Sequence, residues 1–176
     1  MTSAFNVRKA VIADKEKIFT LYKLVAAIPG GIARNRDEIT PEYIGHFMKN
    51  AAVNGVEFVI ENPNDANEIV AEIHAYKWGI EKFSHVFSEL TIVVSPKHHG
   101  KGLGKMIFTQ LLEYIEDERP DIFRVELAAQ ESNEKAISFY KKIGFVQEGR
   151  FENRIKTVSG YEADIVMAWF NKNFGK

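Results

Sequence analysis

A glycine-rich turn separates a β-forming run from a segment with helical spacing. The run is Leu90–Val94, and the stretch His99–Lys105 that follows contains three glycines. Glycine lets the backbone adopt positive φ and lets a ligand approach closely. The first amides of a helix have no partners and carry the positive end of its dipole. This order indicates a phosphate or diphosphate site, to which Lys101 and Lys105 would add charge.

Two common phosphate-binding patterns do not fit this turn. A Walker A loop would need a glycine where Lys105 stands, five residues after Gly100. The dinucleotide pattern G-x-G-x-x-G fails because the spacing here is G-x-G-x-G. The alternative to a ligand site is a plain glycine turn that only begins a helix.

Asn133 and Tyr140 form a second candidate group. They lie seven residues apart, about two helical turns, and so share one helix face. An asparagine amide can hydrogen-bond an extended ligand, and a phenol can donate a proton to a departing thiolate. The alternatives are a helix N-cap for Asn133 and a half-buried aromatic residue for Tyr140.

The hydrophobic pattern predicts the elements that must position these groups. Asp14 is a plausible N-cap of a helix that ends at Pro29–Gly31, and Thr40 with Pro41 begins a helix that Gly55 stops. A loop that enters a helix is expected from Gly100 to about Glu118, and a further helix over Asn133–Ile143, closed by Gly144. The expected strands are Phe5–Val11, Val56–Glu61, Ile69–Trp78, Val86–Val94, Val125–Ala129, Phe145–Arg150 and Tyr161–Phe170. The order β-α-α-β-β-β-α-β-α-β-β predicts one mixed α/β domain over residues 1–176.

Composition excludes several function classes. The 23 Lys and Arg residues nearly balance the 24 Asp and Glu residues, so no global field favours nucleic acid or an anionic membrane. Cysteine is absent, which excludes disulfides, thiolate metal sites and a cysteine nucleophile. Met1–Asn6 lacks the pattern of a secretory signal, and no apolar run approaches the roughly 20 residues that span a bilayer. The expected location is the cytoplasm.

The two segments resemble the signature motifs of the GNAT superfamily of acyl-CoA-dependent N-acyltransferases. The first motif, [Q/R]-x-x-G-x-[G/A], is similar to His99–Gly104, and the second, N-x-x-A-x-x-[F/L]-Y-x-x-x-G-F, is similar to Asn133–Phe145. The resemblance extends from Val7 to the last strand. It implies a mixed, mostly antiparallel sheet with a central parallel pair, flanked by about four helices.

The resemblance also implies roles in binding acetyl-CoA. The diphosphate would lie against His99, Gly100, Lys101, Gly102, Leu103, Gly104 and Lys105. The pantetheine arm would pair with the strand residues Ile92, Val93 and Val94, where two parallel strands would separate near Val94, commonly through a bulge. Asn133 would bind pantetheine, and Tyr140 would act as general acid at the sulfur. The family usually has Arg or Gln at the position of His99, so cofactor affinity is in question here and the fold is not.

Attack on a thioester requires a neutral amine, so a group must accept a proton. Glu89, which precedes Val94 on the expected central strand, is the candidate base, and a solvated strand carboxylate is the alternative. A free backbone N–H near Val94 would stabilise the oxyanion. No metal is expected, because His98 and His99 lack nearby carboxylates at ligand spacing.

The resemblance implies N-acetylation of a primary amine, with a non-catalytic acyl-CoA-binding module as the alternative. In this family the loop between the first two helices helps to shape the acceptor site. Here Arg34 or Arg36 would bind a substrate carboxylate or, alternatively, be solvated. The segment Glu152–Asp164 is similar to members that acetylate protein N-termini or small amines. A protein N-terminus, an amino acid analogue and a polyamine stay open, and the lack of a dense acidic patch disfavours the polyamine. Homodimers are common in the family.

Overall fold

The computed structural model describes residues 4–176, so Met1–Ser3 of the N-terminal segment considered above lie outside the described residues. The α-helices are Lys15–Ala26 (α1), Pro41–Asn54 (α2), Leu103–Glu118 (α3) and Glu134–Lys142 (α4). The strands are Val7–Lys9 (β1), Gly55–Asn62 (β2), Asp65–Tyr76 (β3), Val86–Phe87 (β4), Glu89–Val94 (β5), Arg124–Gln130 (β6), Val146–Thr157 (β7) and Gly160–Phe170 (β8). The predicted order of elements is confirmed, except that one predicted strand is divided into β4 and β5.

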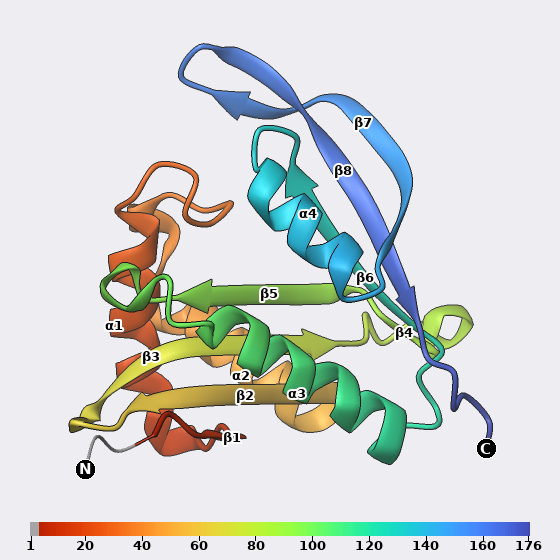
Figure 1. Cartoon of the computed structure of the whole chain (residues 1–176), viewed down its shortest axis with the longest axis horizontal. Coiled ribbons are helices and arrows are strands. Elements are labelled where there is room, and N and C mark those ends of the chain that lie inside the picture. Colours follow the sequence, from red (N-terminus) through yellow and green to blue (C-terminus); the bar gives the residue numbers. More distant parts are fainter. Residues whose placement is uncertain (1–3) are drawn as a thin grey trace.

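The strands form two sheets, in the orders β1-β2-β3-β5 and β4-β6-β8-β7. All neighbouring pairs are antiparallel except β4 and β6, which are parallel. The predicted mixed, mostly antiparallel architecture with a central parallel pair and four helices is thereby confirmed. The two sheets diverge from the end where β4 lies, and the β7–β8 hairpin extends past α4 (Figure 1).

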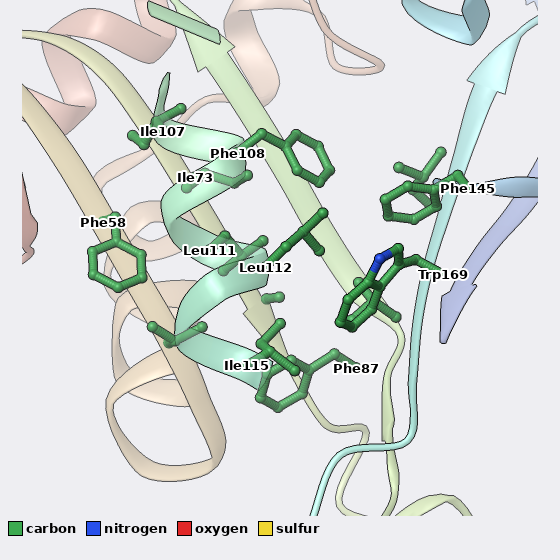
Figure 2. Close-up of a cluster of buried hydrophobic side chains, with 14 of the residues drawn as sticks. Phe58, Ile73, Phe87, Ile107, Phe108, Leu111, Leu112, Ile115, Phe145 and Trp169 are labelled. Atoms are coloured by element: carbon green, nitrogen blue, oxygen red, sulfur yellow. The ribbon is translucent and has the colours of Figure 1, made fainter. Parts of the chain in front are cut away.

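The first sheet is covered on both faces, with α3 on one side and α1 and α2 on the other (Figure 1). On the α3 side, Ile107, Leu111 and Ile115 pack against Phe58 and Ile73. The side chains of Phe145, just before β7, and Trp169 of β8 approach from the side of the second sheet (Figure 2). On the other side, residues of α1 and α2 enclose Val59, Ile69 and Val93. Burial on both faces explains why β2 and β3 read as nearly continuous apolar runs.

Local signals set most element ends. Thr40 Oγ1 accepts the Tyr43 N–H at 3.1 Å and Pro41 occupies the first turn of α2, as predicted. Gly144 follows α4 with φ 101°, the left-handed conformation expected of a residue just after a helix. Asp14 occupies the N-cap position of α1 as predicted, but its carboxylate binds Arg8 and the Val11 N–H and makes no capping hydrogen bond to that helix.

Strand β7 is longer than predicted. It runs to Thr157, because the polar stretch after Arg150 stays paired with β8 across an irregularity between Phe151 and Ile155. Asn153, with φ 53°, lies in that irregularity. Within residues 4–176, no helix combines the length and apolar character needed to cross a membrane.

Candidate active site

A wedge-shaped opening separates β5 from β6. Strands β4 and β6 pair only at Val86↔Arg124 and Phe87↔Val125. After Ser88 the chain pairs with β3 alone, while β6 continues beside β8. Over the described residues, the edges of β5 and β6 that face each other therefore carry no ladder hydrogen bonds, and backbone groups line the opening.

The separation begins at Ser88 and not, as predicted, near Val94. Between Glu89 and Val94 the register with β3 is regular, so no bulge precedes Val94. The Ser88 N–H donates to the Tyr76 carbonyl at 3.2 Å, and its hydroxyl is buried without a partner at the point where the strands part. The change of partner strand at this residue, and not a local turn, opens the wedge.

The glycine turn lies at the far end of β5 and leads into α3. Gly100 and Gly102 have φ 78° and 77°, so both adopt the left-handed conformation that other residues avoid. No side chain caps α3, and a Cβ built on either glycine would meet no protein atom within 4 Å. Unpartnered helix N–H groups thus face open space, which fits a diphosphate.

His99 and Lys101 flank this turn. His99 Nε2 lies 3.2 Å from the Val94 carbonyl, which can only accept, so the ring donates and ties the turn to the end of β5. Lys101 Nζ lies 5.5 Å from the centroid of the Phe5 ring. The residue that departs from the family pattern therefore connects the two parts of the expected cofactor site.

Helix α4 carries Asn133 and Tyr140. Asn133 Oδ1 accepts the Ala136 N–H at 3.2 Å, so this side chain caps the helix and its amide NH₂ remains to donate. Tyr140 packs among the rings of Phe108, Phe139 and Phe145. Burial raises the pKa of Tyr140 to about 12, so the phenol keeps its proton at neutral pH.

Glu89 lies on the opposite face of β5 from Tyr140. Leu90, Ile92 and Val94 pack toward α3 and α4, as Tyr140 does, whereas Glu89 lines a pocket bordered by α2. This pocket has a volume of about 770 Å³. Glu89 Oε1 accepts the Trp78 indole N–H at 2.6 Å. Glu89 and Tyr140 therefore lie on opposite sides of β5, the strand that borders the wedge.

Behind the pocket, Glu72 joins two other side chains in a buried network that the sequence analysis missed. It accepts the Tyr22 hydroxyl at 2.6 Å, and its other oxygen lies 3.0 Å from His74 Nδ1. The His74 ring lines the pocket and stacks on Phe47, with 4.1 Å between centroids.

Burial lowers the pKa of His74 to about 4. Burial raises the pKa of Glu57, which lies near Glu72, to about 9 and also raises that of Glu72. The signal in the sequence was a glutamate inside each of two apolar strands. The contact between these glutamates depends on how the two strands pair, which the sequence does not show.

Together, the glycine turn and the strand wedge are the features of an acyl-CoA-dependent acyltransferase. The chain belongs to the Acetyltransferase (GNAT) family, whose sequence profile matches residues 31–145. That family uses acetyl-CoA as its cosubstrate.

Curated relatives and solved structures agree with this family. The chain is 30% identical over 114 residues to a spermidine N(1)-acetyltransferase of Vibrio cholerae, covering 64% of this chain and 60% of that protein. It is 31% identical over 77 residues to a [ribosomal protein bS18]-alanine N-acetyltransferase of Salmonella typhimurium, covering 44% of this chain and 51% of that protein. The aligned part therefore spans less than two thirds of either relative. A GNAT-family acetyltransferase structure from Streptococcus pneumoniae superposes with a TM-score of 0.83 at 20% identity, covering 95% and 99% of the two chains.

Proposed function

We propose that the chain transfers an acetyl group from acetyl-CoA to the primary amine of a small molecule or a protein N-terminus by direct attack. The observation that carries this proposal is that two candidate groups lie on opposite faces of β5, the strand that borders the wedge. Glu89 borders the pocket on the α2 side, and Tyr140 packs on the α3 and α4 side. An amine and a thioester that approach from opposite faces would meet between β5 and β6.

The residues of the turn and wedge fit coenzyme A, which supplies an activated acetyl thioester when bound. The N–H groups of Gly100–Lys105 hold the diphosphate, with Lys101 and Lys105 adding charge and His99 fixing the turn to β5. The free edge at Ile92–Val94 pairs with the amides of the pantetheine arm, and the Asn133 NH₂ donates to it. Since both facing edges lack a strand partner in the described chain, such pairing requires no disruption of the sheet.

Glu89 accepts the proton that the attacking amine must lose, directly or through water. A free backbone N–H near Val94 stabilises the oxyanion, and Tyr140 donates its proton to the departing thiolate. With its pKa raised to about 12, Tyr140 is protonated throughout the neutral range and so is always ready to donate.

The first prediction concerns Tyr140→Phe in a thiol-release assay with acetyl-CoA and a panel of amines and peptides. We expect kcat to fall by roughly 100-fold or more, because a positioned acid contributes about 10²- to 10⁴-fold. The Kd for coenzyme A, measured by calorimetry, should change little. Tyr114→Phe is the matched control, since its hydroxyl contacts Lys9 outside the wedge. Equal rates in wild type and Tyr140→Phe would contradict the role of the phenol. Coenzyme A binding without turnover of any acceptor would instead favour the non-catalytic module.

A further inference from the structure

Arg34 lies on the α1–α2 loop and lines the pocket that contains Glu89. Its guanidinium lies 4.2 Å from the centroid of the Tyr43 ring on α2. The loop is held on both sides of this arginine. Gly31 packs so closely against the end of α1 that an added Cβ would lie 2.5 Å from the Val25 carbonyl oxygen. Lys23 Nζ donates to the Arg36 carbonyl at 2.8 Å. Arg34 is therefore presented to the pocket by an anchored loop.

The guanidinium of Arg34 has no carboxylate partner in the described part of the chain. Of the seven arginines, the five outside this loop form ion pairs: Arg8, Arg119, Arg124, Arg150 and Arg154. Arg36 shares the loop and is also unpaired across residues 4–176, but it does not line the pocket. A guanidinium with free donors, stacked on a ring, is a receptor for a carboxylate or a related oxyanion.

The same pocket contains one carboxylate, that of Glu89, and only one of its oxygens is engaged by Trp78. The other ionisable side chains of the lining are His46, His74, two tyrosines and Lys77, and His46 Nε2 lies 2.9 Å from the side-chain nitrogen of Asn50. His74 is neutral because burial lowers its pKa to about 4. Burial raises the pKa of Tyr43 and of Tyr76, so both phenols also stay neutral. Lys77 pairs with Asp121 at 2.8 Å. The pocket thus offers an unpaired cation and a carboxylate to one small ligand.

We propose that the acceptor is a small zwitterion, an α-amino acid or a close analogue, with its carboxylate on Arg34 and its ammonium group at Glu89. This inference rests on the proposed function and narrows it. A polyamine brings a second cation toward Arg34, and a peptide N-terminus has no carboxylate beside its amine. In the reaction the N–C bond forms and the C–S bond breaks. The ammonium group loses two protons, one to Glu89 before attack and one after it. The thiolate gains one proton from Tyr140, and the balance of one proton is released to solvent.

The test compares each amino acid in a panel with its amide and with its decarboxylated amine, for example phenylalanine with 2-phenylethylamine. We expect kcat/KM to be roughly 10-fold or more higher for the amino acid than for the amine, as for a charge-assisted hydrogen bond. Arg34→Met should lower kcat/KM for the amino acid by roughly 10- to 100-fold and change that for the amine less than about twofold. Arg36→Met, the matched control, should change neither.

Two results would overturn the zwitterion inference: turnover of amines, polyamines or peptides as efficient as that of amino acids, or an equal loss for both substrates in Arg34→Met. A coenzyme A-dependent melting shift in Arg34→Met that matches wild type shows that the variant is folded. If no acceptor is turned over, the proposed function fails. In that case calorimetry with the amino acids tests the carboxylate site by itself. Binding that is lost in Arg34→Met and kept in Arg36→Met would support the site, whereas no binding of amino acids to the wild-type protein would exclude it.

Discussion

At the scale of single residues, the buried network behind the pocket determines the shape of one pocket wall. His74 is held between the rings of Phe47 and Tyr76 and is bonded through Nδ1 to Glu72. A buried polar group of this kind is tolerated only when its partners are present. Glu57 departs from that rule, since its Oε1 is buried without a partner.

The second prediction is that Glu57→Gln weakens the pH dependence of stability. Burial raises the pKa of Glu57 to about 9 from the ordinary 4.5. Between these values the unfolded chain ionises and the folded chain does not, so this residue makes stability fall as pH rises. We expect the wild-type Tm to decrease between pH 7 and pH 9 and the decrease in Glu57→Gln to be smaller by about 3 °C or more.

Measuring above pH 7 separates the contribution of Glu57 to the pH dependence of stability from that of His74. The pKa of His74 is lowered to about 4, so its contribution to stability changes only below its ordinary 6.5. Glu113→Gln, at an exposed position of α3, is the control and should follow wild type. Melting curves of Glu57→Gln that run parallel to wild type across this range would show that Glu57 is ionised in the folded protein.

The residues that sequence reasoning recovered are those with a local signal. Thr40, Pro41 and Gly144 act within a few positions of themselves, so propensity and capping rules suffice for them. Asp14 shows the limit of this reasoning, because its carboxylate accepts hydrogen bonds from Arg8 and from the Val11 N–H and not from the first turn of the helix. Glu72 meets Tyr22 across 50 positions of the chain, and no local pattern reports such a contact.

At the scale of elements, the decisive feature is a β-forming run that changes partners. The segment Val86–Val94 reads as one strand because residues on both sides of Ser88 are β-formers. The division into β4 and β5 depends on which strand lies beside each half, and a single sequence does not contain that information. The helix that follows was easier to predict, since glycines mark where the chain enters α3.

The third prediction tests that entry. Gly102→Glu should weaken coenzyme A binding by roughly 10-fold or more, because the side chain fills the open space at the turn and its charge repels a diphosphate. Gly175→Glu is the matched control, since Gly175 also has positive φ, 72°, and open space around its Cβ position. Both variants carry similar backbone strain, and calorimetry should show normal affinity only for Gly175→Glu. An unchanged Kd in Gly102→Glu would remove the basis for a diphosphate site at this helix.

At the scale of the whole molecule, two sheets share a core but little backbone pairing. The pairing of β4 with β6 lies within the second sheet, and the chain crosses into the first sheet at Ser88, whose N–H donates to the Tyr76 carbonyl of β3. The rest of their relative position depends on α3 and on packing of residues such as Phe108 against Phe145 (Figure 2). A ligand that lies in the wedge contacts both sheets and should stabilise their arrangement as a unit.

The fourth prediction follows from this arrangement. Coenzyme A at about 100 times its Kd should stabilise the fold by about 2.7 kcal/mol and raise Tm by about 5–10 °C. Hydrogen exchange should slow in Glu89–Val94 and in the part of β6 after Val125, whose facing edges are unpaired in the described chain. Protection confined to α3 would contradict pairing of the pantetheine arm with the strand edge. In Gly102→Glu, both the increase in Tm and the slower hydrogen exchange should be mostly lost.

The division of β4 from β5 has a consequence for how this protein can change over evolutionary time. In the proposed function, acetyl-CoA would contact mostly main-chain groups of the wedge and the glycine turn, which amino acid replacements leave in place. The neighbouring pocket is built from side chains on the α1–α2 loop, on α2 and around Trp78. If this pocket receives the acceptor, replacements there would alter which amine is accepted while the donor stays the same. Specificity for the acceptor would then diversify independently of the chemistry.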